Sequence, residues 1–102
     1  MDLSKEGLEM FFKPYQIQVL KTLWSTGKPL NSGEVWRAIG VDQISRASVI
    51  NFLNEMTEDG FLVMETTTGK GGHYGLYSPR WDEKGTKKHL VMAITEKLQE
   101  LV

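Results

Sequence analysis

The stretch ISRASVINFLNEMTEDGFLVMETTTGKGGHYGLYSP, residues 44–79, decides the fold of this chain. Its first half predicts an amphipathic helix, because Ser45 suits an N-cap and apolar residues follow at intervals of three and four. These apolar residues are Val49, Phe52, Leu53 and Met56. Gly60 ends the helix, and two segments of alternating side chains follow, joined by a glycine-rich tip over residues 67–72. The stretch therefore predicts a helix that leads directly into a β-hairpin.

Two more helices precede this stretch. Residues 14–25 carry apolar side chains at helical spacing, with Pro14 suited to the first turn and Gly27 to the end. Asn31 and Glu34 have the spacing of a capping box and predict a second helix that stops at Gly40. The turn over residues 41–44 then has the length found in helix-turn-helix motifs. Three helices followed by a hairpin indicate a winged helix-turn-helix, a fold that presents the first turns of its third helix to DNA.

Composition is that of a single domain. With 102 residues, of which 40% are hydrophobic and 25% charged, the chain can bury one core but not two. We expect a mainly α protein with a small β-hairpin, of the α+β class, with the winged helix-turn-helix over residues 14–80. Residues 1–13 form an N-terminal extension that we expect to be helical, and residues 81–102 contain a C-terminal helix.

The residue types present leave little room for catalysis. The chain has no cysteine, which excludes disulfides, thiolate metal sites and iron–sulfur clusters. His73 and His89 stand outside any metal or general-base motif, and the glycines around Lys70 lack the spacing of a phosphate-binding loop. We therefore expect no enzymatic activity, no metal site and no cofactor, and the residues indicate no particular small-molecule effector.

The sequence gives no sign of a membrane or export segment. No apolar run approaches the roughly 18 residues of a membrane span. The first ten residues, MDLSKEGLEM, have neither a basic leader nor a hydrophobic signal core. We expect a cytoplasmic protein.

The last helix, predicted from about Thr86, carries an apolar stripe. Its apolar residues recur every three or four positions, as in about two heptads of a coiled coil. They are Leu90, Val91, Ile94, Leu98 and Leu101. Two heptads seldom hold a coiled coil together, so the stripe needs a partner surface. It either packs on its own domain or joins two copies of the chain, and we favour a homodimer.

Charge is the main difficulty for a DNA-binding function. The formal net charge is −1, whereas domains that bind phosphates usually carry a basic excess. Arg46, however, lies in the first turn of the third helix, while Glu55, Glu58 and Asp59 lie toward its far end. The end of this helix that we expect to meet DNA is therefore its basic end.

The predicted DNA contacts lie in the first two turns of the third helix and in the hairpin. Arg46 could bind guanine, Asn51 adenine, and Ala47 a thymine methyl group. Lys70, flanked by glycines, is the hairpin residue best placed to reach a phosphate, and Lys28 and Arg80 are weaker candidates. The predicted DNA-binding set is Ser45, Arg46, Ala47, Ser48, Asn51, Lys70 and His73.

Each of these residues also has a purely structural interpretation. Ser45 is first of all an N-cap, although the helix end that it caps could also meet a phosphate. Arg46 and Asn51 could simply belong to a solvated helix face. We expect Trp24, Trp36 and Tyr74 to pack in the core or against the hairpin rather than to stack on bases.

The chain resembles a known family over about residues 15–79. The segments YQIQVLKTLWSTGKPLNSGEVWRAI, ISRASVINFLNEMTEDGFL and GGHYGLYSP are similar to those of the penicillinase repressor family, which includes β-lactamase, methicillin-resistance and copper-transport repressors. The most specific positions are Leu23, Trp24 and Gly27, then Ser45, Val49, Leu53 and Asn54, and finally Tyr74, Tyr77, Ser78 and Pro79. MarR-like regulators share the architecture and are a close second.

The resemblance implies a homodimeric repressor that binds a palindromic operator, with the third helix in the major groove and the hairpin against the backbone. Glu55, Met64 and Glu65 stand where the family often has basic residues, so we expect weaker phosphate binding. The copper response depends on cysteines and is not expected here. The near-neutral charge keeps a second function open: a winged-helix module for protein contacts in a transcription assembly or other assembly, without direct DNA binding.

Overall fold

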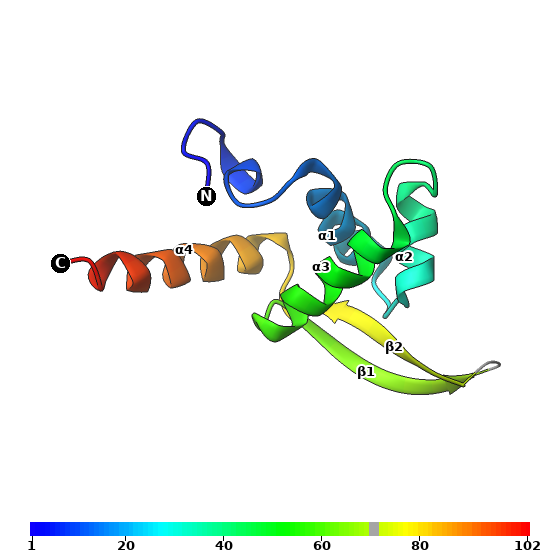
Figure 1. Ribbon diagram of the computed structural model, residues 1–102. Helices are drawn as coiled ribbons and strands as arrows, with labels where there is room; N and C mark the ends of the chain where they lie inside the picture. Colours follow the sequence, from blue (N-terminus) through cyan, green and yellow to red (C-terminus); the bar gives the residue numbers. More distant parts are fainter. Residues whose placement is uncertain (70–71) are drawn as a thin grey trace.

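The computed structural model describes residues 1–69 and 72–102 of the chain. Three helices are followed by a two-stranded hairpin and a long C-terminal helix (Figure 1). The elements are η1 (Gly7–Met10), α1 (Pro14–Thr26), α2 (Ser32–Ile39), α3 (Arg46–Glu58), β1 (Leu62–Gly69), β2 (Gly72–Pro79) and α4 (Glu83–Gln99). This is a winged helix-turn-helix, as the sequence predicts.

Local capping signals set the helix boundaries. The backbone N–H of Glu34 donates to Asn31 Oδ1 (2.8 Å), and the N–H of Asn31 donates to Glu34 Oε1 (3.0 Å), which completes the predicted capping box of α2. The N–H of Ser48 donates to Ser45 Oγ (3.1 Å) at the start of α3. Gly27 ends α1 with a φ of 73°, a left-handed conformation that favours glycine.

One hydrophobic core lies between the first three helices and the base of the hairpin. The inner face of α3 is at most 3% exposed, and it packs against α1, α2 and β1. The core residues are Val19, Leu20, Leu23, Leu30, Val35, Val49, Phe52, Leu53, Met56, Leu62 and Tyr77. Burial of one face of α3 in this core orients its opposite face toward solvent.

The hairpin is joined to the helices at its base. β1 and β2 pair antiparallel, from Leu62 opposite Pro79 to Gly69 opposite Gly72. Leu30 adds a short third pairing, because its N–H donates to the Tyr77 carbonyl (2.9 Å) and its carbonyl accepts from the Tyr77 N–H (2.7 Å). The connection between α1 and α2 is therefore tied to β2 by one isolated β-bridge beside the two-stranded sheet.

The strands are longer than the sequence predicts. The sequence predicts a tip over residues 67–72, but Thr67, Thr68 and Gly69 all continue β1. The ring of Tyr74 packs across Gly69, with its Cε1 atom 2.7 Å from the point where a Cβ of residue 69 would lie. Gly69 thus makes room for a cross-strand aromatic contact instead of starting a turn.

The terminal segments also differ in their limits from the sequence prediction. Residues 1–13 contain one short 3-10 helix, η1, in place of a longer helix. Leu8 is buried, and the ring of Phe12 packs edge-on against Phe52 at 5.8 Å, so the extension covers the core beside α3. α4 begins at Glu83 and not near Thr86, because Asp82 Oδ1 accepts from the Gly85 N–H (2.7 Å) and caps the helix earlier.

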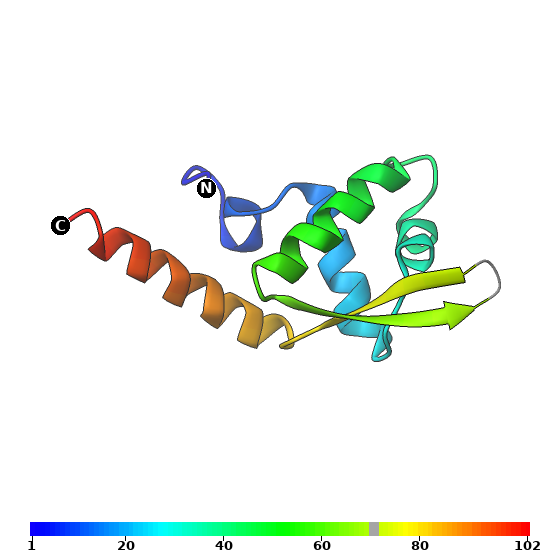
Figure 2. The same cartoon turned by 60° about the horizontal axis from the view of Figure 1, so that its bottom comes forward.

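The molecule is elongated, with principal extents of 52, 27 and 22 Å. α4 projects from the body, and both views place its C-terminal end opposite the end of the hairpin where β1 stops and β2 begins (Figures 1 and 2). The N-terminal end of α3 lies toward the hairpin end in the same two views. Within the described residues, no helix is long and apolar enough to cross a membrane.

Candidate nucleic-acid interface

The first two turns of α3 present polar side chains to solvent. Arg46, Ala47 and Asn51 are exposed, as is the N-cap Ser45, while Ser48 is half-buried. Val49, one residue away, is completely buried. The core therefore fixes the rotation of α3 about its axis and leaves the predicted contact residues on one accessible face.

The two serines at this helix end bind each other. Ser45 Oγ lies 2.8 Å from Ser48 Oγ and accepts the Ser48 N–H. The Ser45 hydroxyl thus caps the helix and also binds the Ser48 hydroxyl, which supports the structural interpretation of Ser45. A phosphate at this position would meet the remaining free N–H groups of the helix start before it met the serine side chains.

The turn before α3 is held by a tryptophan. Trp36 Nε1 donates to the Ile44 carbonyl at 2.8 Å, so a side chain of α2 fixes the residue that precedes the α3 N-cap. Trp24 Nε1 likewise donates to the Trp81 carbonyl at 3.1 Å. Both indoles have packing roles, as predicted.

An arginine that the sequence analysis missed lies beside Arg46. Arg37 Nη1 and Arg46 Nη2 lie 3.3 and 3.5 Å from the point where a Cβ of Gly33 would be. The two guanidinium groups come from α2 and α3, and both lie over Gly33 in the first turn of α2. The spacing of Gly33 and Arg37, four residues apart on one helix face, is a local signal for the placement of Arg37.

The hairpin offers a different kind of surface. Lys70 lies outside the described residues, as does the side chain of His73. In the described part of the hairpin, Val63, Met64 and Tyr74 are exposed apolar or aromatic side chains, and Glu65 is an exposed acid. Tyr74, expected to pack in the core or against the hairpin, lies over Gly69 but remains 42% exposed.

Asn54 connects α3 to the hairpin. Its side chain is exposed on the outer face of α3, as the helical periodicity predicts, and its Oδ1 atom accepts from the Tyr77 hydroxyl at 2.7 Å. Burial raises the pKa of the Tyr77 hydroxyl above its ordinary value of 10.0. The helix α3 and the base of the hairpin are therefore fixed relative to each other.

Lys28 and Arg80, the weaker candidates for DNA contacts, lie together near the junction between α1 and α4. Both line a surface hollow between the end of α1 and the start of α4, with Trp24 and Trp81. The Arg80 guanidinium lies 5.7 Å from the Trp81 ring centre. These two cations thus share one hollow at the junction with α4, apart from the exposed face of α3.

The apolar stripe of α4 is largely uncovered. Val91 and Leu98 are 61% and 53% exposed, while Leu90 and Ile94 are half-buried. The helix ends at Gln99, so the predicted stripe residue Leu101 lies beyond α4, where it is 82% exposed. The stripe therefore does not pack on its own domain over most of its length. The start of α4 is held by the Trp81 ring, which stacks on His89 with centroids 3.5 Å apart and meets Phe61 edge-on at 5.9 Å.

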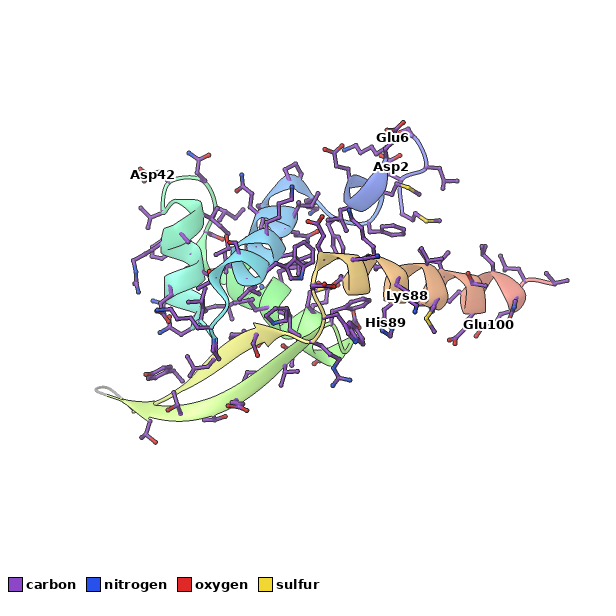
Figure 3. The ribbon with its side chains drawn as sticks, turned by 180° about the vertical axis from the view of Figure 1, so that it is seen from behind. Asp2, Glu6, Asp42, Lys88, His89 and Glu100 are labelled. Atoms are coloured by element: carbon purple, nitrogen blue, oxygen red, sulfur yellow. The ribbon has the colours of Figure 1, made fainter. Side chains whose placement is uncertain are left out.

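Ion pairs and clusters of possible metal ligands are few in the described residues. One ion pair is present there, between Lys87 Nζ and Glu83 Oε2 at 3.3 Å on α4. No three His, Asp or Glu side chains of that part gather closely enough to hold a metal ion. Figure 3 places Asp42 on the turn between α2 and α3, at the end of the molecule opposite Glu100.

Comparison with known proteins gives a family and a fold. The sequence profile described as penicillinase repressor matches residues 14–101. Among curated proteins, no sequence matches significantly. A solved structure described as a possible transcriptional regulator from Methanosarcina mazei Go1 is similar at a TM-score of 0.66 and 14% identity, over 88% of this chain and 77% of that one. A candidate transcriptional regulator from Thermoplasma acidophilum has a TM-score of 0.57 and 21% identity, over 86% of this chain and 90% of that one.

Proposed function

The chain belongs to the penicillinase repressor family, a family of transcriptional repressors and not of enzymes, and from this we propose that it represses transcription by binding DNA directly. In this proposal two copies bind a near-palindromic operator. Each copy places the start of α3 in a major groove and its hairpin against the backbone.

The exposed face at the start of α3 carries this proposal. Ala47 and Asn51 are accessible on a helix whose opposite side is locked in the core. Asparagine can pair with the N6 and N7 atoms of adenine, and alanine can contact a thymine methyl group. Ser45, Ser48 and Arg46 flank them at the helix end, and Lys70 and His73 are proposed as hairpin contacts from the sequence alone.

The homodimer is proposed from the uncovered stripe on α4. Leu90, Val91, Ile94, Leu98 and Leu101 would leave water if two copies of α4 packed together. Such a dimer would give the operator its two-fold symmetry.

A second candidate function has its own support. The exposed Val63 and Tyr74, which the register puts on one face of the hairpin, together with a net charge of −1, suit a surface that binds protein instead of phosphate. Under this alternative the winged helix would act within a larger assembly and would not bind DNA itself.

The salt dependence of DNA binding distinguishes the two functions. If a dimer neutralises four to six phosphates, a plot of log K against log salt should have a slope of about −4 to −5. Lys70→Ala should make this slope less steep. Lys5→Ala, which removes an exposed cation on the N-terminal extension, serves as the matched control and should leave the slope unchanged. A flat response, or no binding of duplex DNA even at low salt, would favour the protein-binding module.

A further inference from the structure

Two guanidinium groups converge on one point at the surface of the helix-turn-helix. Arg37 of α2 and Arg46 of α3 each bring a terminal nitrogen to within 3.5 Å of the point where a Cβ of Gly33 would lie. Gly33 is buried beneath them, while both arginine side chains are exposed. A Cβ at position 33 would lie in tight contact with Arg37 Nη1 and in ordinary van der Waals contact with Arg46 Nη2, so both guanidinium groups pack directly over Gly33.

The positive charge at this point is not neutralised. In the part of the chain that the structure describes, no carboxylate oxygen lies within 4.0 Å of a nitrogen of either arginine, so neither forms an ion pair. The one ion pair of that part, Lys87 with Glu83, lies on α4. The nearest polar oxygen to the same point is Asn31 Oδ1 at 3.4 Å, and this oxygen already accepts the Glu34 N–H. Glu34 itself accepts the Asn31 N–H, within the capping box.

Two like charges held close together without a counter-ion repel each other, and an anion placed between them removes the repulsion. The planar fork of guanidinium suits the paired oxygens of a phosphate group. We propose that Arg37 and Arg46 together bind one phosphate of the DNA backbone. This inference rests on the proposed function and gives Arg46 a different role from the guanine contact considered above.

A phosphate contact by Arg46 changes which residues can recognise the DNA sequence. A phosphate contact positions the protein on the duplex but carries no sequence information. If Arg46 holds a phosphate, base reading at the start of α3 falls to Ala47 and Asn51. The arginine pair would then set how deeply α3 enters the groove.

The test compares Arg37→Met, Arg46→Met and the double variant on two duplexes, the preferred sequence selected from a random pool and a scrambled sequence of equal length. Each single variant should weaken binding about five- to tenfold on both duplexes alike. The double variant should lose less than the product of the two single losses, because both arginines act on one phosphate. Asn51→Ala is the matched comparison and should lose affinity on the preferred duplex only.

The salt slope gives a second measure. Loss of one phosphate contact per protomer should reduce the slope by about 2 per dimer, whether one arginine or both are removed. A reduction of about 4 in the double variant would mean two separate phosphates and would overturn the proposal. So would a loss for Arg46→Met confined to the preferred duplex, or unchanged binding by Arg37→Met.

Failure of the proposed function would be distinguishable from failure of this site. If the wild-type protein binds no DNA, titration with inorganic phosphate, followed by the NMR shift of the Gly33 amide, tests the pair on its own. A saturable shift that Arg37→Met abolishes would support an oxyanion site. The absence of a saturable shift in the wild-type protein would overturn it.

Discussion

Tyr77 joins the hairpin to the helices through both its backbone and its side chain. Its backbone pairs with Leu30, and its hydroxyl donates to Asn54 of α3 at 2.7 Å. Its side chain is only 7% exposed, and this burial is the cause of its raised pKa. The neutral phenol is therefore the form that the folded protein favours.

This raised pKa predicts how stability responds to alkaline pH. Because the folded protein holds the Tyr77 proton more tightly than the unfolded chain does, the contribution to stability is complete below about pH 10. It should be lost as the pH rises from there through the raised pKa. Tyr77→Phe should lower the free energy of unfolding near neutral pH by about 1 kcal/mol, through loss of the Asn54 hydrogen bond. Between neutral and high pH, the free energy of unfolding of this variant should decline less than that of the wild-type protein.

Urea unfolding at pH 8 and at pH 10.5 measures both effects. An equal decline with pH in the two proteins would show that Tyr77 does not contribute to it.

At this scale the sequence predicts what is local and misses what joins distant residues. The Asn31–Glu34 capping box and the Ser45 cap were predictable because each involves residues three positions apart. The placement of Arg37 and Arg46 over the same glycine was not predictable, because it depends on how α2 packs against α3. The Tyr77–Asn54 bond was missed for the same reason, since it joins the hairpin to a helix.

At the scale of elements, α4 differs from the other helices. Thr86 is its only fully buried residue, and Val91 and Leu98 of its stripe are more than half exposed. A helix with so little packing gains little stability from its own domain. Its apolar stripe was predictable from spacing alone, but the early start at Glu83 was not, because Asp82 as an N-cap has no capping-box partner to reveal it.

Charge placed in the stripe should separate the proposed dimer. Ile94→Asp with Leu98→Asp would bury four carboxylates in a dimer of α4, which is strongly unfavourable. Light scattering should then give the mass of a monomer. Ala93→Asp with Gln99→Asp adds the same charge to exposed positions away from the stripe and should leave the dimer intact. An unchanged mass in the stripe variant would place the interface elsewhere.

At the scale of the molecule, the two proposed interfaces lie at opposite ends. The molecule is 52 Å long; the start of α3 and the hairpin lie toward one end, and the C-terminal part of α4 lies at the other (Figure 2). A dimer joined through α4 would therefore keep both copies of α3 free. The sequence order alone predicts this architecture, but the length that separates the two ends follows from how far α4 projects.

This arrangement predicts a fixed spacing between half-sites. Two recognition helices should enter major grooves about 34 Å apart, one turn of the duplex. Insertion of five base pairs between the half-sites turns one of them to the opposite side of the DNA. Affinity should then fall to that of a single half-site, and insertion of ten base pairs should restore part of it. Gel retardation on the three duplexes measures this, and equal affinity for all three would mean that each copy binds independently.

The attachment of the hairpin at Leu30 and Asn54 has a consequence for the kinetics of association. Because α3, Leu30 and the base of the hairpin are already held together in the free protein, binding to DNA as proposed requires little rearrangement of these segments. The conformational entropy of these segments is lost during folding and not again at the encounter. The rate of association with DNA should accordingly be governed by diffusion and charge steering. Differences in affinity between DNA sequences should emerge mainly as differences in the residence time of the protein on each sequence.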